Sequence, residues 1–290
     1  MPDSRFASLE AFLKTGREAV APGPVSLILA EDDIEVDSTI RHHLDLGFGT
    51  VAVFADPAIS ITDDLAARVL RVDCALSATG ALSRIVDGAI EMLPGRWIHY
   101  GYNAEYLFYP FCEHRTVGEL TTFATEERRS SVLTYVVDAY AGDLDAHPSA
   151  VKLDDAHLDR TGYYALARTD RWGNPLERQL DFFGGLRWRF EEHVQKQRRR
   201  IDRVSLFQAK PGLTLRADHT FDDPEYNTYA CPWHNSITAA CVSFRTAKAL
   251  KRNPGSTYDI PTFRWHNSAP FEWHSQQLLD LGLMEPGQWF

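Results

Sequence analysis

The chain of 290 residues is poor in cysteine and has no long apolar run. Its four cysteines are widely spaced and form no C-x-x-C pair. That spacing excludes a zinc ribbon and a disulfide framework, and it is typical of proteins of the reducing cytosol. No apolar run approaches the roughly 20 residues that a membrane-spanning helix needs. The first residues, MPDSRFASLEAFLKTG, carry acids and lack a long apolar core, so we expect no secretory signal and a cytoplasmic location.

Positive charge is also scarce. The formal net charge is −10, which argues against nonspecific binding to nucleic acid. The only basic run is QKQRRR at residues 195–200. This run fits either a solvated helix face or a contact with an anionic polymer or a peripheral contact with a membrane surface that carries acidic lipid.

The first half of the chain alternates between short apolar runs and amphipathic segments. We expect buried parallel strands at 25–30, 50–55 and 97–102, with helices at 35–46 and 79–93 between them. A short helix and a further strand near Val69–Val72 complete the pattern. This alternation predicts an α/β fold with a mostly parallel sheet. Neither a Walker loop nor G-x-G-x-x-G follows the first strand, which counts against other nucleotide-binding α/β enzymes.

The second half is less regular. We expect a strand at 131–140, a charged helix at 191–204, loops at 213–235, and a helix or strand–helix at 237–254. The sequence shows no internal repeat and no linker. We therefore expect one domain over residues 1–290, with a nucleotide-binding half at about 24–110 and an acceptor-binding half at about 111–290.

The segment 97–110, WIHYGYNAEYLFYP, combines a buried strand with an acidic and aromatic continuation. It resembles the W-(x)n-D-A-D-E-F-L-x-x-P signature of family 2-like glycosyltransferases of the GT-A fold. Glu105 matches the glutamate of that signature, and the apolar tail also matches. The two aspartates that hold the metal in the family fall on Tyr102 and Ala104.

Four further segments resemble family motifs in the same order, and together they cover about residues 24–250. They are an opening like V-x-N-E…H-x-x-x-G-V, a strand that ends in aspartate, a segment like M-D-x-Y, and FFGGLRWRF, which resembles G-G-x-R-x-R. The family's N-x-S-x-D-x-T companion to the second motif is absent. The matched positions are Glu31, His43, Gly47, Asp56, Asp138, Tyr140, Gly184, Gly185, Arg187 and Arg189.

This resemblance implies a GT-A-like, Rossmann-type three-layer sandwich with an irregular C-terminal acceptor half. It also implies transfer of a sugar from a nucleotide-sugar donor to a saccharide or lipid-linked acceptor. The alternative is a degenerate domain that binds a nucleotide sugar or glycan without turnover, as the lost metal carboxylates suggest.

For the donor, we predict that Ala30, Glu31 and Asp56 bind the nucleotide, because ligands of open α/β sheets lie beyond the carboxyl ends of the strands. Glu105 adds a carboxylate, and Asn103 could add a carbonyl. Neither Tyr102 nor Ala104 replaces the lost aspartates. We therefore assign no metal ligands and expect weak or absent dependence on Mn²⁺ or Mg²⁺, with retained metal binding as the alternative.

Cationic side chains could neutralise the diphosphate instead. Arg187 and Arg189 are the best candidates, since we expect them to face the same side of a strand beside two glycines. The alternative is a pair of surface arginines that flank a β-turn. For the catalytic base we consider Asp138 at the end of an apolar strand, Asp222 in a polar loop, and His234 among aromatic neighbours. A purely structural role is the alternative for each.

Overall fold

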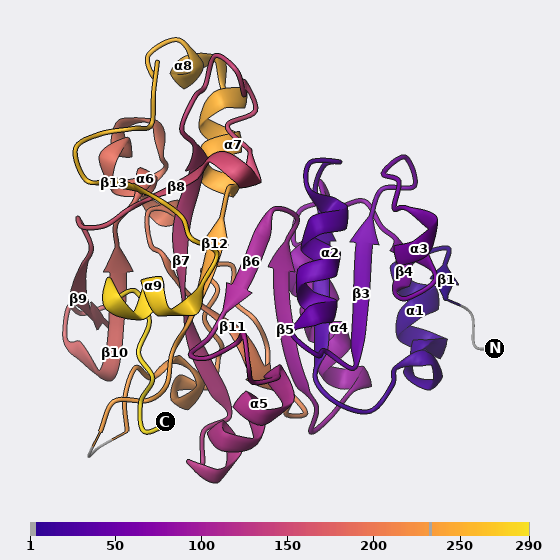
Figure 1. Ribbon diagram of the computed structural model, residues 1–290. Helices are drawn as coiled ribbons and strands as arrows, with labels where there is room; N and C mark the ends of the chain where they lie inside the picture. Colours follow the sequence, from indigo (N-terminus) through magenta and orange to yellow (C-terminus); the bar gives the residue numbers. More distant parts are fainter. Residues whose placement is uncertain (1–3, 232–233, 290) are drawn as a thin grey trace. The chain divides into compact units, whose positions relative to one another are not determined.

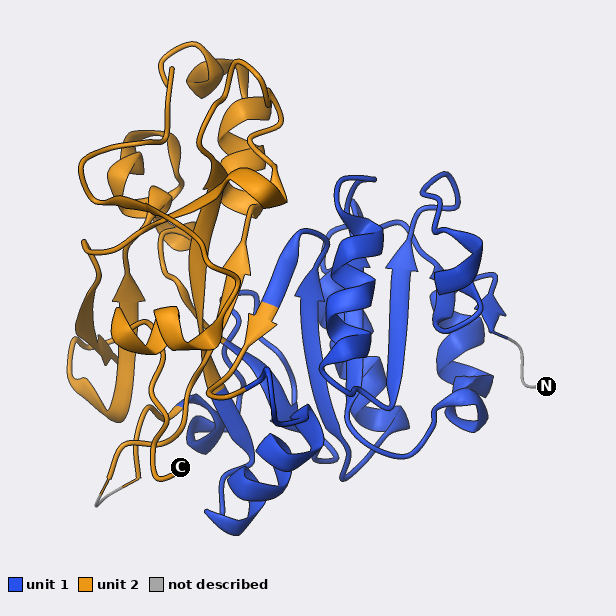
Figure 2. Cartoon of the chain, in the orientation of Figure 1, with its two compact units in different colours: residues 1–106, 112–132, 204–227 blue, residues 107–111, 133–203, 228–290 orange. Residues whose placement is uncertain are grey.

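The computed structural model describes residues 4–231 and 234–289, and the chain divides into two compact units (Figure 2). Unit 1 contains residues 1–106, 112–132 and 204–227. Unit 2 contains residues 107–111, 133–203 and 228–290. Among the described residues, no helix combines the length and the apolar composition that a membrane crossing requires.

Unit 1 is built on a parallel sheet whose strand order is β4-β3-β2-β5 (Figure 1). The three strands predicted as parallel are confirmed with their bounds, and all three lie in this unit. Every residue in them is buried, which explains their continuous apolar sequences. The strands are β2 (Val25–Ala30), β3 (Thr50–Ala55), β4 (Leu70–Asp73) and β5 (Trp97–Tyr102).

Two other strands extend this sheet. β1 (Arg5–Phe6) pairs with β4 in parallel. β11 (Asp202–Gln208) pairs with β5 in the antiparallel direction through its last three residues. The expected α/β class with a mostly parallel sheet is therefore confirmed.

The helices of unit 1 follow the predicted pattern. α2 (Val36–Asp45) connects β2 to β3, and α4 (Ala81–Met92) connects β4 to β5. These connections run across the sheet in opposite directions, so right-handed crossovers place α2 and α4 on opposite faces, as Figure 1 shows. The remaining helical segments are α1 (Leu9–Thr15), η1 (Gly16–Ala19), α3 (Asp63–Ala66), α5 (Val117–Glu126) and η5 (Pro224–Asn227).

Unit 2 has a smaller sheet and a separate hairpin. β7 (Ser131–Ala141), most of which belongs to this unit, pairs with β12 (Ala239–Ser243) in parallel. β7 also pairs with β8 (Ala156–Asp159), and β8 pairs with β13 (Ser268–Pro270), both in the antiparallel direction. β9 (Tyr164–Thr169) and β10 (Pro175–Phe183) form the hairpin. The short strand β6 (Glu105–Phe108) is divided between the units.

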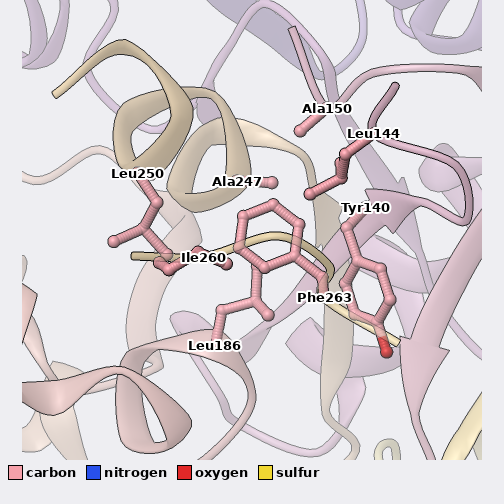
Figure 3. Packing of buried hydrophobic residues seen from close by; sticks show 8 residues of the cluster. All are labelled: Tyr140, Leu144, Ala150, Leu186, Ala247, Leu250, Ile260 and Phe263. Carbon is pink, nitrogen blue, oxygen red and sulfur yellow. The ribbon is translucent and has the colours of Figure 1, made fainter. Parts of the chain in front are cut away.

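The helices of unit 2 are short, and one of its apolar clusters joins them to β7. Tyr140 from β7 packs with side chains from two helices and from the loops around them (Figure 3). The cluster contains Tyr140, Leu144, Ala150, Leu186, Ala247, Leu250, Ile260 and Phe263. The helical segments are η2 (Leu153–Asp155), α6 (Leu186–Arg189), η3 (Glu191–His193), η4 (Lys196–Arg198), α7 (Arg245–Arg252), α8 (Pro254–Thr257) and α9 (Ser275–Asp280).

Two predictions for the second half are wrong. The arginine-rich segment that follows the two glycines is a single helical turn, α6, and not part of a strand. Gly184 (φ 156°) and Gly185 (φ 62°) end β10, because their positive φ angles turn the chain out of the strand. Residues 191–204 do not form a charged helix but two short 3₁₀ turns followed by β11. The segment 237–254 is a strand followed by a helix, one of the two predicted arrangements.

Candidate functional site

The carboxyl edge of the parallel sheet in unit 1 contains a topological switch point. The chain leaves β2 toward β3 on one side and later returns to β5 on the other side of β2. The loops that follow β2 and β5 therefore diverge from adjacent strand ends, which is where open α/β sheets bind ligands. The loop after β2 begins with Glu31 and Asp32, and the turn after β5 begins with Asn103.

Asn103 joins these two loops. It is fully buried. Its side-chain oxygen accepts a hydrogen bond from the Glu31 N–H at 2.9 Å, and its amide group donates to the Asp32 carboxylate at 2.6 Å and to the Ile34 carbonyl at 2.8 Å. Its backbone N–H donates to the Leu29 carbonyl at 3.1 Å. The loop after β2 is therefore held in one conformation by a side chain from the neighbouring strand end.

The predicted nucleotide-binding residues lie along the same edge. Ala30 is the buried last residue of β2, and the exposed Glu31 follows it. Asp56 follows β3 directly and is exposed, and its carboxylate accepts a hydrogen bond from the Ala58 N–H at 2.9 Å. The fold therefore brings all three residues to the carboxyl ends of two adjacent parallel strands.

The residues at the altered metal motif do not fit a divalent cation. Glu105 is 1% exposed, and its Oε2 accepts the Tyr102 N–H at 2.9 Å. The Asn103 carbonyl oxygen accepts the Glu31 N–H, and Ala104 has no ligand atom in its side chain. Hard cations need several oxygen ligands that converge on one point. Within residues 4–231 and 234–289, no group of three or more His, Cys, Asp or Glu side chains could hold a metal ion.

The helical histidine of the resemblance, His43, lies in the core of unit 1. It is 1% exposed, and its Nδ1–H donates to the Thr39 carbonyl at 2.8 Å. Its ring lies 5.0 Å from that of His99, whose Nδ1 is 3.1 Å from the Ser26 hydroxyl. Burial lowers the pKa of His43 to about 3, with a smaller contribution from the adjacent His42. This histidine is therefore a neutral packing residue at physiological pH.

In unit 2, the first arginine of the G-G-x-R-x-R segment is bound to a buried carboxylate. Asp138 is 1% exposed; it accepts the Arg187 backbone N–H at 3.2 Å, and its other oxygen lies 3.3 Å from the guanidinium. Burial raises the pKa of Asp138, and the nearby Arg187 charge opposes that shift. Arg187 also donates to the Thr246 hydroxyl at 3.1 Å and to the Arg200 carbonyl at 2.7 Å. A general base must contact the hydroxyl it deprotonates, and this carboxylate is enclosed by protein.

The second arginine binds another buried carboxylate, which the sequence analysis missed. Arg189 contacts both oxygens of Asp159, at 3.1 and 3.2 Å. The same carboxylate accepts hydrogen bonds from the Tyr140 hydroxyl at 2.6 Å and from the Trp265 indole at 2.7 Å. In the sequence, only the position of Asp159 at the end of the short segment AHLD could have indicated this carboxylate. Both arginines proposed for the diphosphate are therefore neutralised by buried aspartates of unit 2.

The other two catalytic candidates lie in different units. Asp222 is in an exposed loop of unit 1, and it accepts the Thr214 N–H at 2.9 Å, a bond that lowers its pKa. His234 is half-buried in unit 2, directly after residues 232–233, which lie outside the described part of the chain. Asp138 belongs to unit 2 as well.

No protein-family model matches the chain. A search of curated proteins finds no match either.

The hydrogen bonds between Asn103 and the loop after β2 predict a loss of stability when Asn103 is replaced. Asn103→Ala removes the partly buried hydrogen bonds to the Glu31 N–H and the Ile34 carbonyl, and each such loss costs about 1–3 kcal/mol. We expect the free energy of unfolding measured in urea to fall by about 2–4 kcal/mol. Asn174→Ala, which removes an exposed amide bonded to Asp170, is the matched control and should change it by less than about 1 kcal/mol. Equal effects of the two substitutions would contradict this role of Asn103.

Proposed function

We propose that unit 1 binds the nucleotide of a nucleotide sugar beyond the carboxyl ends of β2, β3 and β5, and that the protein transfers the sugar to a saccharide or lipid-linked acceptor. The observation that supports this most strongly is the switch point itself. An exposed acid at residue 31 follows β2, and Asn103 from the end of β5 holds its loop in place. A preorganised loop at such a crevice suits ligand binding, because less conformational entropy is lost when the ligand binds.

The chemistry of these residues suits the nucleoside part of the donor. Carboxylates and carbonyls accept hydrogen bonds from ribose hydroxyls and from the N–H groups of a base. Asp56 and Glu31 follow adjacent parallel strands and supply two such exposed carboxylates. The order of motifs in the sequence, which resembles family 2-like glycosyltransferases, supports the same assignment.

The donor reaction in this proposal does not use the family's metal site. Tyr102 and Ala104 stand where the resemblance requires aspartates, and Glu105 is buried and bound to a backbone N–H. We therefore expect nucleotide binding to persist in EDTA. The same observation favours a second candidate function, in which the domain binds a nucleotide sugar or glycan without turnover.

Nucleotide binding can be tested directly. We expect UDP, GDP or one of their sugars to raise the melting temperature in EDTA, since a ligand at 100 times its Kd adds about 2.7 kcal/mol of stability. Asp56→Ala should raise the Kd of the ligand found in this way by at least about tenfold in calorimetry, because one hydrogen bond to a charged group contributes about 1.5–3 kcal/mol. Glu126→Ala, an exposed acid at the end of α5, is the matched control and should leave the Kd unchanged.

Four outcomes separate the alternatives. Release of nucleoside diphosphate in the presence of acceptor supports transfer, whereas binding without release supports the degenerate domain. Binding that needs Mn²⁺ would overturn the metal-independent assignment. Absence of binding by every nucleotide would remove the proposed function.

A further inference from the structure

In the described part of the chain, most of the large exposed apolar side chains lie in the hairpin of unit 2 and the helical turn that follows it. The described residues include five large apolar side chains that are exposed. Four of them come from the hairpin and the helical turn that follows it, and Tyr258 is the fifth. The four are Tyr164 (45%), Leu166 (56%), Trp172 (71%) and Trp188 (41%). Exposed apolar side chains gathered in one region of a soluble fold mark an interaction surface.

Two of these side chains lie on one side of β9, and a third lies near the start of that strand. Tyr164 and Leu166 are two residues apart in a strand, so they point to the same side. The Trp188 ring packs against Gly162, where an added Cβ would lie 3.0 Å from it. Gly162 precedes Tyr164 by two residues. The Tyr164 ring is stacked on Phe183, its cross-strand partner in β10, with centroids 5.2 Å apart, so the neighbouring strand holds this ring in place.

Trp172 occupies the tip of the same hairpin. The Asp170 carboxylate accepts hydrogen bonds from the backbone N–H groups of Trp172 at 2.8 Å and of Asn174 at 2.9 Å. These bonds close the turn, and the Arg171 guanidinium lies 4.0 Å from the centre of the Trp172 ring. The tip is therefore an ordered turn that presents an indole and a cation together (Figure 1 shows the hairpin as β9 and β10).

The region is basic in an acidic protein. Residues 160–200 contain ten Lys and Arg against five Asp and Glu, whereas the whole chain has 30 against 40. Several of these arginines are neutralised by nearby carboxylates, as Arg187 and Arg189 are. Four exposed cations form no ion pair with an Asp or Glu anywhere in the described parts of the chain: Arg160, Arg171, Lys196 and Arg198.

These cations lie near both ends of the hairpin. Arg171 lies at the tip of the hairpin, and Arg160 precedes its base. Lys196 and Arg198 belong to η4, and the chain then pairs Arg200 with Phe183 at the end of β10. The exposed apolar side chains therefore have unpaired positive charge at both ends.

We propose that the hairpin surface, defined by Tyr164, Leu166, Trp172, Trp188 and the four unpaired cations, binds a bilayer that contains anionic lipid. Trp and Tyr are the side chains that favour the boundary between headgroups and acyl chains, and Lys and Arg beside them attract acidic headgroups. The aliphatic Leu166 favours a lipid surface over nucleic acid, because it can neither stack on a base nor bind a phosphate. The net charge of −10 also opposes a polyanion that extends beyond this region.

This proposal does not depend on nucleotide binding. Its readout is partition onto vesicles, so its failure and the failure of the proposed function are distinguishable. If both hold, the hairpin would bring the protein to the surface at which a lipid-linked acceptor lies.

The test is cosedimentation of the full chain with phosphatidylcholine vesicles, with and without phosphatidylglycerol. We expect binding only to the anionic vesicles and a decline in binding as salt is raised. Each basic residue near an anionic surface contributes about 1 kcal/mol, so Arg171→Glu, Lys196→Glu and Arg198→Glu together should lower the partition coefficient at least about tenfold. Trp172→Ser should also lower it.

Two control variants make changes of the same kinds at residues outside the hairpin surface. Tyr258→Ser removes the fifth exposed apolar side chain, which is 88% exposed, and Lys14→Glu with Arg17→Glu reverses two exposed cations of unit 1. Both controls should bind anionic vesicles as the unaltered chain does. Equal binding by the hairpin variants and the controls would overturn the proposal, as would no dependence on phosphatidylglycerol. Displacement from vesicles by a short single-stranded oligonucleotide at equal phosphate concentration would assign the surface to nucleic acid instead.

Discussion

Replacing Asp159 by alanine is expected to lower the free energy of unfolding by about 3–5 kcal/mol. The Asp159 carboxylate accepts hydrogen bonds from Arg189, Tyr140 and Trp265, and its removal leaves the guanidinium buried without its counter-charge. The Arg189 side chain is only 11% exposed, so water cannot replace the lost carboxylate. Urea unfolding followed by tryptophan fluorescence measures the change.

Two further variants test the origin of this effect. Glu191→Ala removes the exposed ion pair with Arg199, and we expect a loss of less than about 1 kcal/mol. The double variant Asp159→Leu with Arg189→Met removes both buried charges, and we expect it to recover most of the stability lost in Asp159→Ala. Equal losses in the single and double variants would show that packing, rather than the unpaired charge, dominates.

The stability of unit 1 is expected to fall steeply below pH 6.5 because of His43. Burial lowers the pKa of this imidazole from 6.5 to about 3, while the unfolded chain binds the proton near pH 6.5. Between these values the unfolded state holds a proton that the folded state does not, so lowering the pH favours unfolding. The contribution is fully present above pH 6.5 and falls by about 1.4 kcal/mol per pH unit, or roughly 4–5 kcal/mol in all.

His43→Gln isolates this contribution, because glutamine does not titrate. We expect the variant to be less stable than the unaltered chain at pH 7.5 and to lose less stability as the pH is lowered to 4. His114→Gln replaces an exposed histidine of unit 1 and should leave the pH dependence unchanged. Parallel pH profiles for His43→Gln and the unaltered chain, in urea unfolding at each pH, would contradict the assignment.

The parallel strands of unit 1 could be predicted because their sequences are locally consistent. VSLILA, TVAVFA and WIHYGY are mostly apolar along their whole length, as is typical of buried parallel strands, and each follows or precedes a segment with helical periodicity. The predicted nucleotide-binding positions follow from the same signal, since the ends of these strands determine the edge of the sheet. Ala30, Glu31 and Asp56 therefore lie where the sequence predicted, although ligand binding there remains a prediction.

The second half could not be predicted in the same way, because its structure depends on contacts between distant residues. The segment 191–204 is rich in charge, as exposed helices often are, yet it forms two short turns and then β11. Charged residues of this segment pair with residues outside it: Arg200 binds Asp181 at 2.7 Å and Asp202 binds Arg168 at 2.6 Å. Periodicity within a window cannot report such pairs.

By itself, the sequence determined the α/β class, the bounds of three parallel strands, and the edge at which their polar residues gather. These properties depend on apolar periodicity and on strand polarity, which are local. Only the tertiary structure decided what the polar side chains contact: Asn103 joins two loops, and Arg187 and Arg189 are bound to Asp138 and Asp159. A buried charge or amide must find a partner wherever the fold supplies one, and those partners lie between 30 and 72 positions away along the chain.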